Sequence, residues 1–274
     1  MARRFENMVV IVTGGSQGVG AATARAFARE GARLVLAARG GELLAALAGE
    51  LGGFTDVMTV ELDVTDRAGC RRLLEDAQRR FGRMDILVNN AGCHARGPVE
   101  TVEPDDIARM VEVNLVAPLY LMRLALPYLA QRGGSIVNVA SLNGVAPMAG
   151  AATYSATKVA LRHFSRALAD ELEGRNVRVS LVSPAGIETG FLLNEIDTVD
   201  DIVFSQPMST PERVAEAILE AAEGGAVETF IPRMTARLAF AMLLLPGLAR
   251  RVRPRLRAKG ARVKERYRAR LRRD

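Results

Sequence analysis

The sequence has few of the residues that build disulfide frameworks, metal centres and aromatic binding surfaces. Among its 274 residues are two cysteines, two histidines and no tryptophan, and aromatic residues make up only 5%. Cys70 and Cys93 cannot form a multiple-disulfide scaffold, and adding His94 and His163 gives no metal-ligand spacing. We therefore expect no metal site and a reducing, cytoplasmic compartment.

Length and composition favour one large domain. A chain of 274 residues suits a single α/β core better than two cores, and 49% hydrophobic residues are enough to fill it. The first eight residues are charged and lead directly into the apolar run 9–12. We therefore expect no signal peptide.

Charge is distributed unevenly along the chain. Residues 250–274 contain 13 Lys or Arg and two acidic residues, whereas the rest of the chain carries 24 basic and 29 acidic residues. The net charge of +6 thus describes a basic C-terminal segment attached to a mildly acidic body.

Short apolar runs alternate with longer helical patterns along most of the sequence. This alternation is typical of βαβ units, whose parallel strands are joined by right-handed crossovers. The expected strands are 8–13, 33–37, 57–61, 86–89, 135–141, 177–183 and 227–231. The expected helices are 18–30, 42–51, 67–81, 104–129 (broken in the middle and ending near Pro127), 152–173 and 211–223. The sequence predicts an α/β fold: a doubly wound, Rossmann-type parallel sheet of about seven strands with helices on both faces.

A glycine-rich turn joins the first expected strand to the first helix. It reads Thr13-Gly14-Gly15-Ser16-Gln17-Gly18-Val19-Gly20. Glycines permit a tight turn and a close approach to a pyrophosphate, and the helix N-terminus offers N–H groups and a positive dipole. An ordinary turn could have the same glycines, but its place at the start of a parallel sheet favours a phosphate site. We expect cofactor contacts from Gly14, Ser16, Gln17, Gly18, Val19 and Gly20.

Further motifs follow the Gly-x-x-x-Gly-x-Gly turn in order. They are Asn89-Asn90-Ala91-Gly92, Asn114, Ser141 and Tyr154-x-x-x-Lys158. With these motifs the sequence resembles the short-chain dehydrogenase/reductase family from about Val9 to Ile231. The resemblance implies a nicotinamide cofactor, with Asp63 and Val64 beside the adenine and with Asn90, Ala91 and Gly92 along its ribose side. Asn89 and Asn90 could equally tie strand ends together, and both roles can coexist.

The end of the second expected strand indicates which nicotinamide cofactor binds. Members of the family that prefer NAD usually have an acidic residue there for the ribose hydroxyls, but this chain has Ala38 followed by Arg39. A guanidinium binds a phosphate bidentately, so Arg39 suits the 2′-phosphate of NADP. Although a solvated arginine at a strand end is common, the missing carboxylate also favours NADP.

Tyr154 and Lys158 are four residues apart, so they lie on one face of the expected helix. A nearby ammonium favours the phenolate, and we expect it to lower the pKa of Tyr154 toward the working pH. Ser141 follows the fifth strand and can donate a hydrogen bond to a substrate oxygen. By family resemblance, Lys158 also binds the nicotinamide ribose and Asn114 holds a water in the proton relay.

The segment after the sixth strand departs from the family pattern. The family usually has Pro-Gly here, whereas this chain reads Pro184-Ala185-Gly186-Ile187-Glu188-Thr189. The resemblance still implies cofactor contacts from Pro184, Gly186, Ile187 and Thr189, the last two at the carboxamide. Ala185 alters the backbone if its position requires a positive φ. Residues 189–209 have no clear period, and we expect them to shape the substrate pocket.

The C-terminal segment divides the chain into a catalytic and cofactor-binding domain, 1–235, and an extension, 236–274. Its apolar part, 236–249, is too short and too interrupted by Arg237 and Pro246 to span a bilayer. The apolar and polybasic segments could lie on an anionic membrane surface. Alternatively, the apolar part covers the substrate pocket or a partner subunit while the tail stays solvated. Nucleic-acid binding is not expected, because Tyr267 is the only aromatic residue in the tail.

Together these features predict an NADPH-dependent oxidoreductase that reduces a ketone or aldehyde to an alcohol, with Tyr154 as proton donor. The alternatives are an alcohol dehydrogenase working in the oxidative direction and a cofactor-binding scaffold without catalysis. A small-molecule carbonyl compound is the expected substrate, and a hydrophobic one if the extension binds a membrane. The resemblance also implies a homodimer or homotetramer, formed through the helices at 104–129 and 152–173.

Overall fold

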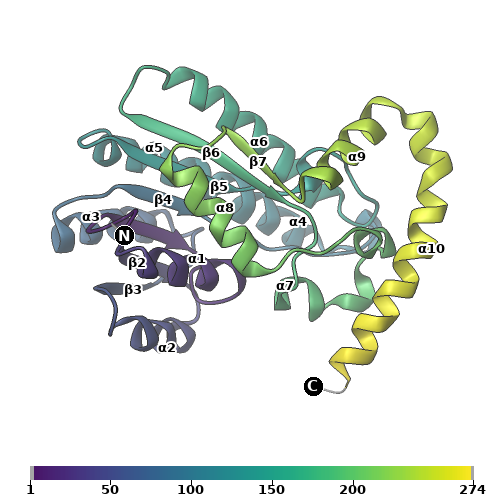
Figure 1. Ribbon diagram of the computed structural model, residues 1–274, viewed down its shortest axis with the longest axis horizontal. Coiled ribbons are helices and arrows are strands. Elements are labelled where there is room, and N and C mark those ends of the chain that lie inside the picture. Colours follow the sequence, from purple (N-terminus) through teal and green to yellow (C-terminus); the bar gives the residue numbers. More distant parts are fainter. Residues whose placement is uncertain (1–2, 273–274) are drawn as a thin grey trace.

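The computed structural model describes residues 3–272 as one α/β body with two helices at its C-terminal end (Figure 1). The strands are β1 Val9–Thr13, β2 Arg33–Ala38, β3 Val57–Glu61, β4 Ile86–Asn89, β5 Gly134–Val139, β6 Val177–Pro184 and β7 Glu228–Ile231. The α-helices are α1 Gly18–Arg29, α2 Gly41–Leu51, α3 Arg67–Phe81, α4 Pro104–Val111, α5 Ala117–Leu129, α6 Ala152–Glu171, α7 Gly190–Leu193, α8 Pro211–Glu223, α9 Arg233–Leu244 and α10 Pro246–Leu271. Short 3₁₀ turns are η1 Val99–Thr101, η3 Leu142–Gly144, η4 Ile196–Thr198 and η5 Asp201–Ser205, and η2 Glu112–Val116 is a π-helical segment.

The seven strands form one parallel sheet in the order β3-β2-β1-β4-β5-β6-β7. The order reverses direction beside β1, so the crossovers place helices on both faces. Every residue of β1, β4 and β5 is buried, as expected of strands covered on both sides. This confirms the predicted fold class.

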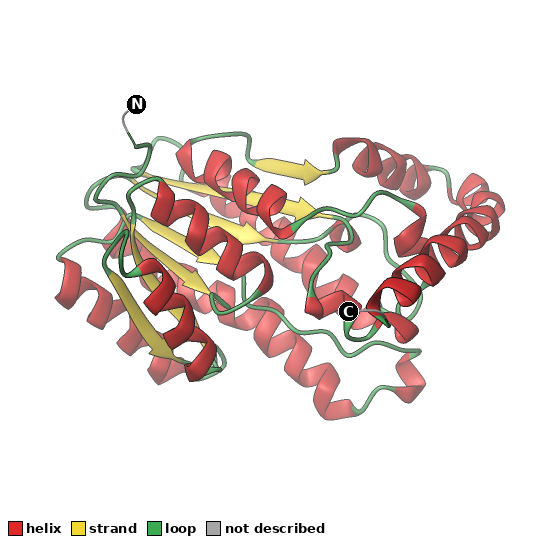
Figure 2. Cartoon of the chain, turned by 60° about the horizontal axis from the view of Figure 1, so that its bottom comes forward, coloured by secondary structure: helices red, strands yellow, loops and turns green. Residues whose placement is uncertain are grey.

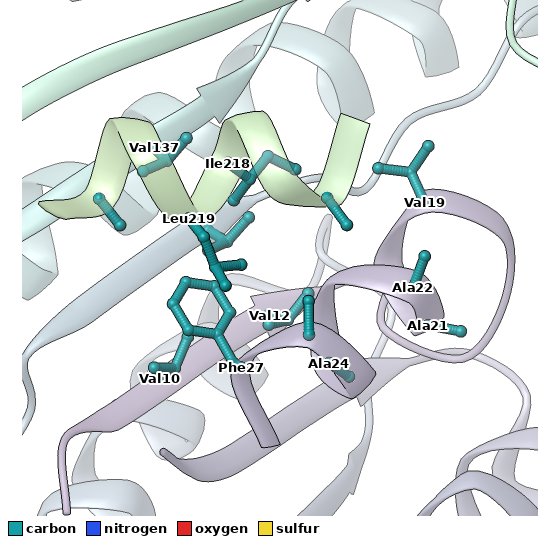
Figure 3. Close-up of a cluster of buried hydrophobic side chains, with 14 of the residues drawn as sticks. Val10, Val12, Val19, Ala21, Ala22, Ala24, Phe27, Val137, Ile218 and Leu219 are labelled. Atoms are coloured by element: carbon teal, nitrogen blue, oxygen red, sulfur yellow. The ribbon is translucent and has the colours of Figure 1, made fainter. Parts of the chain in front are cut away.

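Two apolar clusters hold the helices on the sheet. On one face, α1, α2 and α8 pack around Phe27, Leu36 and Ile218, and Figure 3 shows part of this cluster. On the other face, α3, α5 and α6 pack around Leu74 and Leu121. The sheet is thereby fixed, and its carboxyl edge provides a rigid platform for a site.

The long helical pattern at 104–129 contains the predicted interruption, which is the π-helical segment η2 between α4 and α5. The end predicted near Pro127 is confirmed to within two residues, because α5 ends at Leu129 with Pro127 inside its last turn. A proline so close to the helix end removes one hydrogen bond without breaking the helix. Residues 104–129 are long and apolar enough to cross a membrane by composition, but 44% of their most apolar window is buried inside the protein. We assign them to the core.

The fifth strand ends earlier than predicted, at Val139 instead of Ser141. Ser141 leaves the sheet because its side chain caps η3, where Oγ accepts a hydrogen bond from the backbone N–H of Asn143 at 3.2 Å. The remaining boundaries agree with the predicted ones to within two residues.

The C-terminal helices lie beyond the carboxyl ends of the strands, the side toward which the arrowheads point in Figure 2. The expectation that the basic tail stays solvated is wrong. It forms α10, which packs across the segment 196–205 (Figure 1). The acidic side chains of that segment supply the physical reason, as described below.

Candidate active site

A cavity of about 980 Å³ lies at the carboxyl edge of the sheet. Nearly all the predicted site residues line it: Gly14, Ser16, Gln17, Gly18, Val19, Arg39, Asp63, Val64, Asn90, Ala91, Gly92, Ser141, Tyr154, Lys158, Pro184, Gly186, Ile187 and Thr189. Gly20 and Asn114 do not line it and lie behind the cavity wall. Residues that are distant in the sequence thus meet at one site.

The glycine turn has the backbone geometry that a phosphate site needs. Gly14 and Gly18 have φ of +63° and +53°, which other residues adopt only with strain. A Cβ on Gly20 would lie 2.0 Å from the carbonyl oxygen of Gly14. No side chain caps α1 at Gln17, so the first N–H groups of that helix have no side-chain acceptor. These free donors and the turn fit the pyrophosphate of a dinucleotide.

Arg39 and Asp63 line the cavity just after the ends of β2 and β3. Arg39 is exposed and, within residues 3–272, forms no ion pair. Asp63 accepts a hydrogen bond from the Arg109 guanidinium at 2.9 Å and two more from Thr65. These donors hold the pKa of Asp63 below its usual value even though burial opposes them. Arg109 was not predicted, because its partner is 46 residues away.

The amide side chains of Asn89 and Asn90 tie neighbouring strands together. Asn90 Nδ2 donates to the carbonyls of Thr13 and Gly14 at 3.0 Å, and Thr13 Oγ1 accepts from the backbone N–H groups of Asn90 and Ala91. Asn89 Nδ2 donates to Asn138 Oδ1 at 2.8 Å. Asn90 therefore has the structural role and also lines the cavity.

Tyr154 and Lys158 both lie on α6, and Lys158 Nζ is 5.6 Å from the centroid of the Tyr154 ring. Lys158 is 5% exposed, and its Nζ donates to the carbonyl of Val139 at 3.0 Å. Ser141, between β5 and η3, hydrogen-bonds to the Tyr154 hydroxyl. The end of β5 and the face of α6 thus bring the three side chains together.

The pKa of Tyr154 is raised, whereas the sequence predicted a lowered one. Loss of hydration is the largest cause, and the hydrogen bond from Ser141 opposes it only in part. Burial also lowers the pKa of Lys158 to about 8, so its ammonium is itself weakened as a charge partner. The phenol of Tyr154 is therefore protonated at neutral pH.

Asn114 lies in the π-helical segment η2 and is 1% exposed. Its Nδ2 donates to the Cys93 carbonyl at 2.8 Å, and its Oδ1 accepts from the Cys93 N–H at 2.9 Å. A π-bulge commonly re-aims a side chain at a functional site. Here it fixes the loop after Gly92, beside Lys158.

The loop after β6 accommodates Ala185 without strain. Among residues 3–272, Asn7 is the only non-glycine residue with a positive φ, so the position of Ala185 does not require glycine. The Ala185 N–H donates to the carbonyl of Ile231 at 2.8 Å. Ile187 and Thr189 therefore keep their places in the cavity wall.

His94 is a site residue that the sequence did not single out. Its ring stacks on Tyr154 with centroids 4.4 Å apart and planes 11° apart. Burial, helped by the charges of Arg96 and Lys158, lowers the pKa of His94 to about 4. The imidazole is therefore neutral and covers one face of the phenol ring. The other unassigned neighbour, Cys93, has a pKa raised by burial and is not a reactive thiolate.

The C-terminal helices form the outer wall of the cavity. From α9 come Thr235, Leu238, Ala239 and Met242, and from α10 come Arg253, Leu256 and Arg257. The α9 residues repeat at intervals of three and four, which is one helix face. This period was present in the sequence, but it could not show which surface the face covers.

Ion pairs between α10 and the segment 188–201 hold this wall in place. Arg257 donates to both carboxylate oxygens of Asp200, at 2.7 and 3.2 Å. Lys264 Nζ donates to the Val199 carbonyl at 2.7 Å and lies 3.2 Å from the Asp201 carboxylate. Tyr267 donates to Glu188, between Ile187 and Thr189, at 2.7 Å. The cavity loop is thus linked directly to α10.

Comparison with known proteins identifies the class to which this fold and site belong. A model of the short chain dehydrogenase family matches residues 8–199. The chain therefore belongs to the short-chain dehydrogenase/reductase family and is an oxidoreductase acting on CH–OH or C=O groups with a nicotinamide cofactor.

Three relatives show how far the similarity extends. Meso-2,3-butanediol dehydrogenase of Serratia marcescens is 37% identical over 68% of this chain and 74% of its own. The 3-oxoacyl-[acyl-carrier-protein] reductase of Thermotoga maritima is 34% identical over 79% of this chain and 90% of its own. An uncharacterized oxidoreductase, YxnA of Bacillus subtilis, is 34% identical over 91% of this chain and 72% of its own. The last match is long enough to include part of the C-terminal extension.

Proposed function

We propose that the protein reduces a ketone or aldehyde to an alcohol with NADPH. The observation that carries this proposal is the meeting of Ser141, Tyr154 and Lys158 in a cavity that Arg39 also lines. Residues 1–235 supply the cofactor site and the chemistry, and residues 236–274 complete the wall on the substrate side.

Each side chain has a separate role in the proposed reaction. When bound, the reduced nicotinamide supplies a hydride to the carbonyl carbon. Ser141 hydrogen-bonds to the substrate oxygen, and Tyr154 donates its proton to that oxygen as negative charge develops on it. Lys158 stabilises the phenolate that remains, and Asn114 holds the loop beside it. Reduction starts from the protonated phenol, which is the form that the raised pKa of Tyr154 favours at neutral pH.

Arg39 is the proposed recognition residue for NADP. It lies at the end of β2, it has no carboxylate partner within residues 3–272, and Ala38 adds no negative charge beside it. A 2′-phosphate there gains a bidentate cation without displacing an existing ion pair. NADH lacks this phosphate and gains nothing from the guanidinium.

Cofactor titration of wild type and Arg39→Ala tests the proposal without requiring a substrate. NADPH fluorescence and anisotropy should report tight binding to wild type and at least a tenfold weaker binding to the variant, with NADH little changed. Equal or tighter binding of NADH to wild type would replace the proposal with an NAD-dependent dehydrogenase. If neither cofactor bound, a non-catalytic scaffold would take its place.

We further propose a cytoplasmic homodimer or homotetramer that associates with an anionic membrane surface. The outer face of α4, α5 and α6 supports the assembly, because Val111 and Phe164 are exposed on it and Tyr120 and Tyr128 are only partly buried. Light scattering of the purified protein should give a multiple of the 29.5 kDa chain mass. A monomer at micromolar concentration would contradict it.

A further inference from the structure

Helix α9 is apolar on two sides. One side lines the cavity through Leu238 and Met242. Leu244 lies on the other side and is 76% exposed, and Met234, in the first turn of the helix, is 69% exposed. From 234 to 249 the only charged residue is Arg237. An ordinary amphipathic helix has a polar outer face, so the apolar outer face here needs a partner.

The exposed apolar surface is concentrated where α9 turns into α10. We name this turn the leucine corner; it consists of Leu243, Leu244, Leu245 and Leu248, which are 50%, 76%, 54% and 53% exposed. Figure 1 shows the turn projecting at the edge of the molecule, away from the sheet. Single exposed leucines are ordinary, but four within six residues form a patch.

Unpaired cations follow the leucine corner directly. Arg250, Arg251, Arg255 and Lys259 are exposed, and none forms an ion pair with a carboxylate within the described residues. By contrast, Arg257, Lys264 and Arg268 are neutralised by the acidic segment 197–201. No acidic residue occurs from 234 to 264. Arg262, Arg266 and Arg272 also form no ion pair within the described residues, so the free basic side chains begin next to the corner and continue along α10.

We propose that the leucine corner inserts into the acyl layer of an anionic phospholipid membrane while these arginines bind the headgroups. Apolar residues flanked by basic ones are the pattern of a helix that lies in the membrane interface. Because the opposite face of α9 lines the cavity, the inserted helix separates the bilayer from the active site. The substrate class is then a lipophilic carbonyl compound taken from the membrane, which rests on the proposed reductase function.

A second copy of the chain fits the corner less well. A two-fold contact through this surface would bring the unpaired arginines of both copies together, and no carboxylate nearby would offset the repulsion. An anionic lipid surface supplies the opposite charge instead.

The absence of tryptophan allows a direct test of insertion. Leu244→Trp places one reporter at the corner, and Phe54→Trp places a matched reporter at an exposed position (71%) between α2 and β3. Phosphatidylcholine vesicles containing phosphatidylglycerol should shift the Leu244→Trp emission to the blue, and lipids brominated on their acyl chains should quench it. The Phe54→Trp emission should not change. No shift, or a shift without vesicles that grows with protein concentration, would overturn the proposal.

Flotation distinguishes insertion from charge attraction alone. Leu244→Gln/Leu245→Gln should weaken binding to the anionic vesicles at least tenfold, because the two substitutions remove apolar surface that would be buried in the acyl layer. Phe54→Gln should float like wild type. Equal flotation of all three proteins would mean that the arginines act without insertion and would overturn the role of the corner. These variants are preferable to deleting 236–274, which would remove the cavity wall.

Substrate delivery is tested on the same proteins. Turnover of a ketone dissolved in the vesicles should fall several-fold in Leu244→Gln/Leu245→Gln, while turnover of a water-soluble ketone and NADPH binding stay at wild-type values. An equal rate on the vesicle-borne ketone would overturn delivery from the membrane. If wild type did not bind NADPH, the reductase proposal would be overturned, but the evidence for membrane insertion from the vesicle experiments would be unaffected.

Discussion

The cofactor side and the substrate side of the cavity are built by different physical means. The cofactor side consists of strand ends and a glycine turn, held by buried backbone hydrogen bonds and by amides such as Asn90. The substrate side consists of a loop and two helices, held by ion pairs such as Arg257–Asp200. Fixed backbone positions suit a cofactor of constant shape, whereas exposed ion pairs add little stability and leave a wall that can vary.

The two sides also differ in how they bear charge. Lys158 is buried and its pKa is lowered to about 8, whereas Arg257 on the substrate side is exposed and its pKa is raised by Asp200. Burial of Lys158 lowers the stability of the folded chain, because its ammonium loses hydration. The Arg257–Asp200 ion pair costs little stability and joins two surface elements.

The largest expected effect is on the cofactor side and concerns the Tyr154 hydroxyl. Tyr154→Phe removes the proton donor but keeps the ring that stacks on His94. Turnover should fall by about 10²–10⁴-fold, the usual contribution of general acid catalysis. Stopped assays with NADPH and a ketone would measure the loss, and cofactor titration should show unchanged binding. Tyr128→Phe, outside the cavity, serves as control, and a Tyr154→Phe enzyme as active as this control would contradict the proposed role.

The sequence predicted the cofactor side far better than the substrate side. The glycine turn and Tyr154-x-x-x-Lys158 are local patterns, because a turn or a helix face fixes which residues must lie close together. The polar contacts between α10 and the segment 188–201 join residues 57 to 82 apart, and no local pattern marks such pairs. Tyr154's raised pKa was also unpredictable, because desolvation depends on everything that packs around the ring.

Lys158 should make the stability of the protein depend on pH in a defined window. Its pKa is about 8 in the folded chain and about 10.4 when unfolded. Between these values the unfolded chain binds more protons, so the contribution of Lys158 to stability rises as pH rises from 8 to about 10. The full change is of the order of 3 kcal/mol.

Urea unfolding of wild type and Lys158→Met at a series of pH values measures this contribution. The difference between the two proteins isolates Lys158, because both share the cysteines and Tyr154, whose raised pKa values act in the opposite direction. The free energy of unfolding of wild type should rise relative to that of Lys158→Met between pH 8 and about 10. A constant difference from pH 7 to 10 would show that Lys158 titrates at its ordinary value and is not desolvated.

The smallest expected effect is on the substrate side, where Gly260 lets α10 approach the backbone of Asp201. A Cβ on Gly260 would lie 1.8 Å from the Asp201 carbonyl oxygen, so Gly260→Ala should displace the helix and destabilise the protein by about 1–3 kcal/mol. Gly247→Ala, on the same helix, meets no atom within 4 Å and should be neutral or slightly stabilising. Unfolding curves would measure both variants, and the KM for a ketone should rise in Gly260→Ala while NADPH binding is unchanged. If NADPH binding weakened as much as ketone binding, the two sides of the cavity would not be separable, and the contrast drawn between them would fail.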